Sequence, residues 1–256
     1  MEQTIKKPEI KDLIQNLKTN NDAILIIGDK CAKDSFKINE STKDSFNRKA
    51  MVKTPAEFWK WYDQNIFNNS EISEEEKAIN KLLKKANIKL AINLNNTGHI
   101  HHNNIIELRG NKNILRCMSC DTIYEYLSVS TEEITNKVMK CKCGGKIAPT
   151  VTMFGEKYRQ NDVNAIKDAI FIEDGEKIKL NTHTLIFVGV DFEEDYMHEL
   201  IESFNAIKMN MQEDEKYYTV MICEKDGISI DLYQPEFATY ENIADSINRL
   251  IKHLEE

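Results

Sequence analysis

Residues 105–156 read IIELRGNKNILRCMSC, then 20 further residues, then CKCGGKIAPTVTMFGE. The quoted segments hold four of the six cysteines, as a CxxC pair (Cys117 and Cys120) and a CxC pair (Cys141 and Cys143). Two close pairs of thiols on two tight turns can supply the four sulfur ligands of a tetrahedral zinc ion. We therefore predict a structural zinc site, with no ligand position left open for a catalytic water.

Two other interpretations of these cysteines are a pair of disulfides and four unrelated thiols. Disulfides need an oxidising compartment, and the first residues, MEQTIKKPEIKDLI, have neither the apolar core nor the small-residue cleavage site of a secretory signal. We therefore expect a cytoplasmic chain with reduced thiols, which favours zinc.

The composition limits the classes of partner. The chain has 256 residues and a formal net charge of −8. It is long enough for one large domain that carries a small appendage. Binding to phosphate backbones needs clustered Lys and Arg, so we expect no nucleic-acid partner. A transmembrane helix needs an apolar run of about 18 residues or more, and no apolar run of the chain approaches this length. We therefore expect no membrane insertion.

Short apolar runs alternate with helical patterns along the chain. Strand-like runs lie at 23–28, 88–94, 105–108, 184–190 and 217–223. Apolar residues at helical spacing lie within 10–17, 78–86, 163–170, 196–204 and 243–254. Ser73 and Glu76 form a capping box before the second of these helices. The alternation predicts an α/β fold, a Rossmann-like parallel sheet with helices on both faces.

Two small modules are expected beside this sheet, one helical and one that binds zinc. The aromatic residues within 58–67 are expected to form the core of the helical module, in preference to a ligand platform. The charged residues 173–179 are expected to form a hairpin or a loop. The predicted division assigns 1–30, 86–114 and 150–256 to the Rossmann-like domain, 31–85 to a helical and cofactor-loop insertion, and 115–149 to the zinc-binding module.

Five segments, in this order, resemble the sirtuin family, the NAD-dependent protein deacylases and related ADP-ribosyl transferases. They are INLN (92–95), IELRG (106–110), the two cysteine pairs, VTMFGE (151–156) and VGVD (188–191). The resemblance implies a sirtuin-like fold with a structural zinc. It also implies a cofactor site that includes Gly28, Asn93, Asn95 and Gly189.

The sequence departs from the family pattern where the cofactor and the catalytic base should lie. The family's GAGxS-type loop reads Gly28, Asp29, Lys30 here, which would bring a carboxylate near the pyrophosphate of NAD. The family's general-base histidine is replaced by Arg109, whose guanidinium stays protonated and cannot accept a proton. The other catalytic position implied by the family, Asn93, is retained. NAD or ADP-ribose is therefore expected to bind weakly, if it binds at all.

The resemblance also implies a peptide-binding segment. Val151, Phe154, Gly155 and Glu156 match the family residues that hold a substrate peptide as an added strand. The alternative is that Phe154 is a core residue and Glu156 begins a helix. The loop histidines His99, His101 and His102 are expected to be solvated rather than to form a second metal site.

These observations lead to one main prediction of function and one alternative. The main prediction is a sirtuin-fold pseudoenzyme that is impaired as a lysine deacylase. It would bind a protein or peptide, or weakly a nucleotide, in the cleft where the family binds its cofactor and substrate. The alternative is an NAD-consuming enzyme, namely an ADP-ribosyltransferase, an NAD hydrolase or a weak deacylase. An NAD-linked oxidoreductase is disfavoured because no GxGxxG follows a predicted strand.

Overall fold

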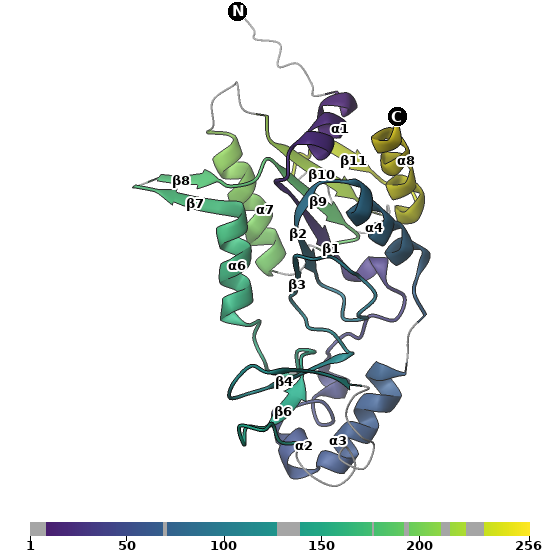
Figure 1. Ribbon diagram of the computed structural model, residues 1–256, viewed down its shortest axis with the longest axis vertical. Helices are drawn as coiled ribbons and strands as arrows, with labels where there is room; N and C mark the ends of the chain where they lie inside the picture. Colours follow the sequence, from purple (N-terminus) through teal and green to yellow (C-terminus); the bar gives the residue numbers. More distant parts are fainter. Residues whose placement is uncertain are drawn as a thin grey trace, which may run out of the picture.

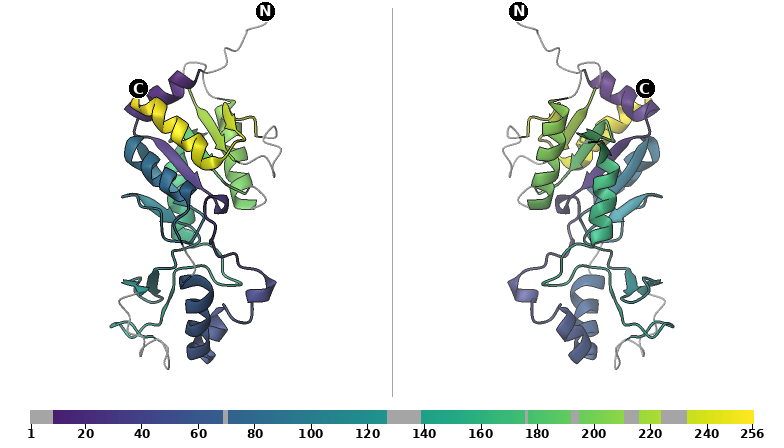
Figure 2. Two further views of the ribbon diagram at one scale, coloured as in Figure 1. Left: turned by 90° about the vertical axis from the view of Figure 1, so that its right-hand side faces the viewer. Right: turned by 90° about the vertical axis from the view of Figure 1, so that its left-hand side faces the viewer.

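The computed structural model describes residues 9–68, 71–126, 139–175, 177–191, 195–210, 216–223 and 233–256. A six-stranded sheet with helices on both faces forms the larger part of the molecule, and a smaller part lies beyond one end of this sheet (Figures 1 and 2). The predicted α/β fold class is confirmed.

The main sheet contains β1 (Ala23–Ile27), β2 (Ile88–Asn93), β3 (Ile105–Glu107), β9 (Thr184–Val188), β10 (Tyr218–Ile222) and β11 (Phe237–Thr239). The strand order is β11-β10-β9-β1-β2-β3, and all neighbouring strands are parallel. Every residue of β1, β9 and β10 is buried, as expected for strands covered on both faces. The order of strand addition reverses between β9 and β1, and open α/β sheets bind ligands at such a switch point.

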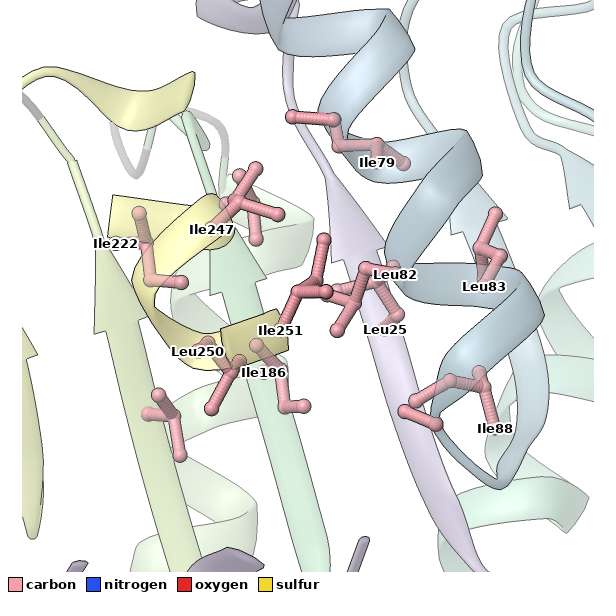
Figure 3. Close-up of a cluster of buried hydrophobic side chains, with 14 of the residues drawn as sticks. Leu25, Ile79, Leu82, Leu83, Ile88, Ile186, Ile222, Ile247, Leu250 and Ile251 are labelled. Carbon is pink, nitrogen blue, oxygen red and sulfur yellow. The ribbon is translucent and has the colours of Figure 1, made fainter. Parts of the chain in front are cut away.

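Two groups of helices cover the faces of the sheet. One face packs against α1 (Ile10–Thr19), α4 (Glu74–Lys85) and α8 (Ile243–Glu255). The other face packs against α6 (Gln160–Ile170) and α7 (Asp195–Lys208). Leu82 of α4 and Ile251 of α8 gather over Leu25 of β1 (Figure 3). The capping box predicted for Ser73 and Glu76 begins α4.

No helix in the described part of the chain combines the length and the apolar character needed to cross a membrane.

Of the two forms predicted for 173–179, a hairpin or a loop, the structure has the hairpin. It pairs β7 (Phe171–Asp174) with β8 (Lys177–Leu180) in antiparallel fashion and projects beside α6 and α7 (Figure 1).

The smaller part combines helices and a second sheet. It contains α2 (Arg48–Lys53), α3 (Pro55–Tyr62), β4 (Ile114–Cys117), β5 (Ile123–Glu125) and β6 (Ile147–Pro149), with strand order β5-β4-β6. The aromatic cluster is core, as predicted: Phe58, Trp59 and Tyr62 pack with Leu115 and Ile147 of the sheet. The predicted domain boundaries stay a prediction. The packing favours joining the helical and zinc modules and assigning α4 to the large sheet, because α4 packs with α8.

Candidate functional site

The four predicted zinc ligands meet in one place. The sulfur atoms of Cys117, Cys120, Cys141 and Cys143 all lie within 4.8 Å of one another. The Sγ–Sγ distances of 3.5 Å for Cys117 and Cys143 and 3.6 Å for Cys120 and Cys141 exceed the about 2.05 Å of a disulfide. The Tyr124 hydroxyl, 3.0 Å from the Sγ of Cys141, lowers the pKa of that thiol to about 6. The donor set therefore fits a closed, tetrahedral zinc site of structural type.

A cleft of about 800 Å³ lies between the main sheet and the smaller part. Asp29, which follows β1, and Arg109, which follows β3, line it together with Asp191 and with residues of the segment 152–158. The strands of a parallel sheet end at the same edge. The residues that follow β1, β3 and β9 therefore lie together, although they are distant in the chain. The cleft is therefore the place to test the predicted catalytic residues.

Arg109 and Asp29 form an ion pair within this cleft. The Asp29 side chain is only 6% exposed and that of Arg109 is 22% exposed. The Ser35 hydroxyl donates to Oδ1 of Asp29 at 2.7 Å, and Nε of Arg109 lies 3.4 Å from the Tyr158 hydroxyl. In the sequence, Asp29 and Arg109 are two separate departures from the family pattern, whereas in the structure each supplies the counter-charge of the other. Lys30 is exposed, so Arg109 is the close counter-ion of Asp29.

The loops that follow β1 and β9 approach each other closely at the switch point. The N–H of Gly28 donates to the Val188 carbonyl at 2.8 Å, and the Cys31 thiol lies 3.2 Å from the same oxygen. A Cβ on Gly28 would lie 2.1 Å from the carbonyl oxygen of Gly189, which has a φ of +57°. The two predicted cofactor glycines thus permit a close approach of two loops.

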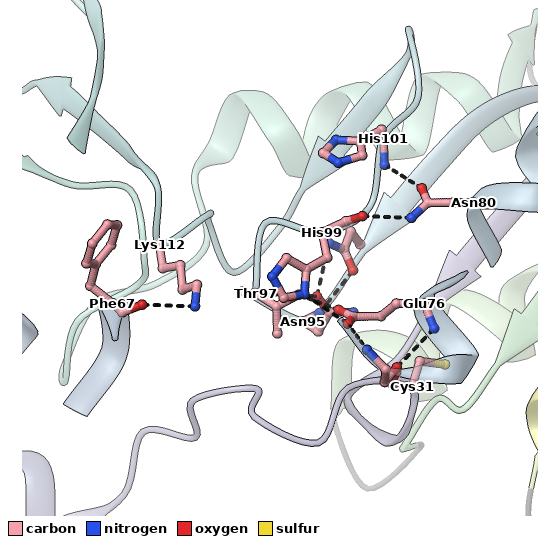
Figure 4. Close-up of polar contacts among 11 residues, drawn as sticks. Cys31, Phe67, Glu76, Asn80, Asn95, Thr97, His99, His101 and Lys112 are labelled. Atoms are coloured by element: carbon pink, nitrogen blue, oxygen red, sulfur yellow. Dashed lines mark hydrogen bonds and ion pairs between the residues drawn. The ribbon is translucent and has the colours of Figure 1, made fainter. Parts of the chain in front are cut away.

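Asn93 and Asn95 lie side by side at the end of β2, and both are fully buried. Nδ2 of Asn93 donates to Oδ1 of Asn95 at 3.3 Å. Nδ2 of Asn95 is buried without a hydrogen-bond partner in the described structure. The Thr97 hydroxyl donates to Oδ1 of Asn95 at 3.0 Å and also contacts Glu76 (Figure 4). The predicted catalytic asparagine therefore belongs to a buried polar network.

The prediction of solvated loop histidines is wrong for His99. Its Nδ1 lies 3.0 Å from Oε2 of Glu76, whose side chain is 1% exposed (Figure 4). The capping role of Glu76 brings this carboxylate to the start of α4, where the loop after β2 reaches it. His101 is exposed, as expected, and His102 is half-buried.

The predicted peptide segment divides into a buried and a cleft-lining part. Val151 is 1% exposed and packs in the core of the smaller part. Phe154, Gly155 and Glu156 line the cleft. Glu156 forms an ion pair with Arg48 of α2, and its Oε2 accepts a hydrogen bond from the backbone N–H of Met153 at 3.1 Å. Glu156 does not begin a helix, because α6 starts at Gln160.

Sequence reasoning missed Glu107, the last residue of β3. It lies opposite Asn93 in the β2–β3 register. Burial raises the pKa of Glu107 to about 7, against the opposing effect of hydrogen bonds from Asn111 and Asn93. The IELRG segment alone contained the residue but no sign of its burial, because burial depends on what the smaller part places over this strand end.

Replacing Glu107 with glutamine is expected to stabilise the protein at about pH 8 by as much as about 3 kcal/mol. The folded chain binds the proton more tightly, between the usual 4.5 and about 7, so stability falls as the pH rises through this window. The substitution removes that loss and has little effect near pH 4. Urea unfolding at both pH values checks this, with the exposed Glu173→Gln as the control. An equal effect of Glu107→Gln at both pH values would contradict it.

A family model supplies the relationship that this geometry suggests. The model of the Sir2 family matches residues 29–190 of this chain. The chain belongs to the Sir2 family. The match contains both members of the ion pair, the four cysteines and the cleft-lining segment 152–158. The identification of a sirtuin from its motifs is confirmed.

Curated sirtuin relatives match part of the chain. An NAD-dependent protein deacetylase of Caldivirga maquilingensis is 31% identical over 47% of this chain and 49% of its own length. The NAD-dependent protein deacylase 1 of Archaeoglobus fulgidus is 30% identical over 43% of this chain and 46% of its own length. The chain thus spans about half the length of these relatives.

Solved sirtuin structures match nearly the whole chain. A structure described as Sir2 bound to acetylated peptide has a TM-score of 0.65 and 16% identity, and covers 96% of this chain and 98% of its own. A variant of a Sir2 homologue in complex with ADP-ribose has a TM-score of 0.67 and 16% identity, with 96% of each chain covered. At this identity the likeness shows the sirtuin fold.

Proposed function

We propose that this sirtuin is impaired as an NAD-dependent lysine deacylase and uses its cleft to bind a protein or peptide, or weakly a nucleotide. The ion pair between Arg109 and Asp29 is the observation that carries the proposal. A guanidinium has no lone pair with which to accept a proton, so Arg109 cannot act as a general base. Loss of a positioned base lowers a rate by about 10²- to 10⁴-fold.

The loop after β1 supports the same proposal. The hydrogen bond from Lys30 N–H to the Gly189 carbonyl, 3.2 Å, ties the loop after β1 to the loop after β9. Asp29, which directly follows Gly28, would place a carboxylate near the pyrophosphate of a bound dinucleotide. The repulsion between these negative charges would weaken binding.

A protein or peptide is the proposed occupant of the cleft. A related fold has been solved as Sir2 bound to acetylated peptide. In this chain, Phe154, Gly155 and Glu156 line the cleft, and a peptide could add to this segment through main-chain hydrogen bonds. The proposed zinc site would hold the smaller part that forms one wall of the cleft. The cytoplasmic location stays a prediction.

An NAD-consuming activity is the second candidate. It is favoured by the buried Nδ2 of Asn95, a donor without a partner in the described structure, beside the retained Asn93. When bound, NAD supplies an activated bond between its ribose and nicotinamide. Asn93 and Asn95 would orient a ligand at the end of β2, and Arg109 would offer positive charge but no base.

Titration calorimetry with NAD and ADP-ribose, followed by an assay of nicotinamide release on a mixed peptide pool, separates the two candidates. We expect no saturable NAD binding up to about millimolar concentration, which corresponds to about −4 kcal/mol, and no nicotinamide release above background. Release that disappears in the Asn93→Ala variant would reject the pseudoenzyme. Binding of ADP-ribose without release would support a weak nucleotide-binding module.

A further inference from the structure

A second cavity lies on the other side of the segment that lines the cleft. Its volume is about 410 Å³, and it shares Thr152, Glu156 and Lys157 with the cleft. Its other walls come from the end of β3, from β4 and β6, and from the start of α6. The cavity therefore sits at the junction of the main sheet and the smaller part, where α6 connects to the segment after β6 (Figure 1).

Arg116 of β4 contributes an unusual side chain to this cavity. Its neighbours Leu115 and Cys117 are fully buried in the core of the smaller part, so alternation along the strand directs Arg116 to the opposite face. Both Nε and Nη1 of Arg116 are inaccessible to solvent, and neither has a hydrogen-bond partner in the described part of the chain. A guanidinium is always charged and offers five donors.

The other arginines of the chain are paired. The chain has five arginines. Arg48 pairs with Glu156, Arg109 with Asp29, and Arg249 with Glu241. Nη2 of Arg159 lies 3.5 Å from Oδ1 of Asp121, and Nη1 of Arg159 lies 3.6 Å from Oδ1 of Asp162. Donor nitrogens of a charged group that are shielded from solvent and have no partner lower stability, because their lost hydration is not replaced.

The carboxylates of the cavity do not compensate Arg116. Glu156, Asp121 and Asp162 already face Arg48 or Arg159. Glu107 accepts a hydrogen bond from Nδ2 of Asn111 at 2.9 Å, so its partner there is a neutral amide. Because burial raises the pKa of Glu107 to about 7, this group carries a proton for part of the time near neutral pH and repels an anion less than a carboxylate would.

We propose that this cavity binds a small anion, a phosphate or carboxylate group, which is held by the Arg116 side chain that lines it. Arginine forms strong, directional hydrogen bonds with both groups. Lys157 at the cavity wall adds positive charge toward the same space. The volume exceeds that of a bare ion, so the cavity has room for a small molecule that carries the anionic group.

The test uses the full-length, zinc-loaded protein with inorganic phosphate and acetate as separate probes, at constant ionic strength set with chloride. Arginine Nε–H resonances are followed by NMR, and the signal missing from the Arg116→Met variant assigns Arg116. We expect a saturable shift of that signal with at least one probe and a rise in melting temperature. In Arg116→Met the dissociation constant of that probe should rise by about tenfold or more, as expected for loss of a charge-assisted hydrogen bond.

Two further results distinguish binding from a purely structural role of Arg116. Without the probe, Arg116→Met should melt no lower than the unsubstituted protein, because it removes an uncompensated charge. The matched control Arg249→Met changes an exposed arginine and should leave probe binding unchanged. If Arg116→Met does not fold, Arg116→Lys replaces it in the binding comparison. The absence of a saturable shift with both probes, or equal binding by the Arg116 variants, would overturn the proposal.

Discussion

Replacing Arg109 with methionine is expected to destabilise the protein by about 3 kcal/mol. The substitution leaves the Asp29 carboxylate, 6% exposed, without its cation in the cleft. The remaining donor, the Ser35 hydroxyl at 2.7 Å, cannot neutralise the charge. Urea unfolding of the purified protein measures the change as a lower midpoint with an unchanged slope.

A double-mutant cycle separates the pair from the cost of losing either partner. Asp29→Asn together with Arg109→Met removes both charges, so we expect this double variant to be more stable than Arg109→Met alone. The exposed pair of Arg249 and Glu241 is the control, and its coupling should stay below about 1 kcal/mol. A coupling of Asp29 with Arg109 no larger than that of the control would show that the two charges do not depend on each other.

Removal of the proposed zinc is expected to unfold the smaller part of the molecule. A structural zinc contributes on the order of 10 kcal/mol to the folding of its module. Cys117 and Cys141 are buried in the same core as Trp59 and Tyr62, so loss of the metal should also disturb α3. We expect a chelator, or Cys141→Ser, to abolish the near-ultraviolet circular dichroism of the tryptophans while the far-ultraviolet signal of the main sheet and its helices largely persists.

Metal analysis provides the direct check of this prediction. The protein purified without chelator should contain about one zinc ion per chain, as four cysteine ligands require. Cys223→Ser is the matched control, because Cys223 is half-buried and packs at the main sheet. Absence of zinc from the purified protein, with an intact near-ultraviolet spectrum, would contradict a zinc site.

Local patterns predicted the secondary structure well. Every residue of the apolar run of β1 is buried, and the apolar face of α8 is buried against the sheet. The capping box of Ser73 and Glu76 also forms as predicted. These features depend on interactions between residues a few positions apart, which a single sequence records directly. The smaller strands β4, β5 and β6 were not predicted individually, because each has only three or four residues.

The candidate site was only partly predictable. The four cysteines were identified as one cluster because their spacing itself carries the chemistry of the site. Glu107 and His99 carried no such signal. The elevated pKa of Glu107 arises mainly from burial. The contact of His99 with Glu76 joins residues 23 positions apart.

The sequence by itself determined the α/β class, the sirtuin relationship and the cysteine cluster, while the place of Arg109 at the family's general-base position stays a prediction. Each of these is a property of residue type and local spacing. Only the tertiary structure decided that Arg109 and Asp29, 80 residues apart, form one ion pair. The same holds for Arg116, whose charge is left unpaired in the described structure. The physical reason is that electrostatic pairing and burial depend on which chain segments the parallel sheet brings together at its edge.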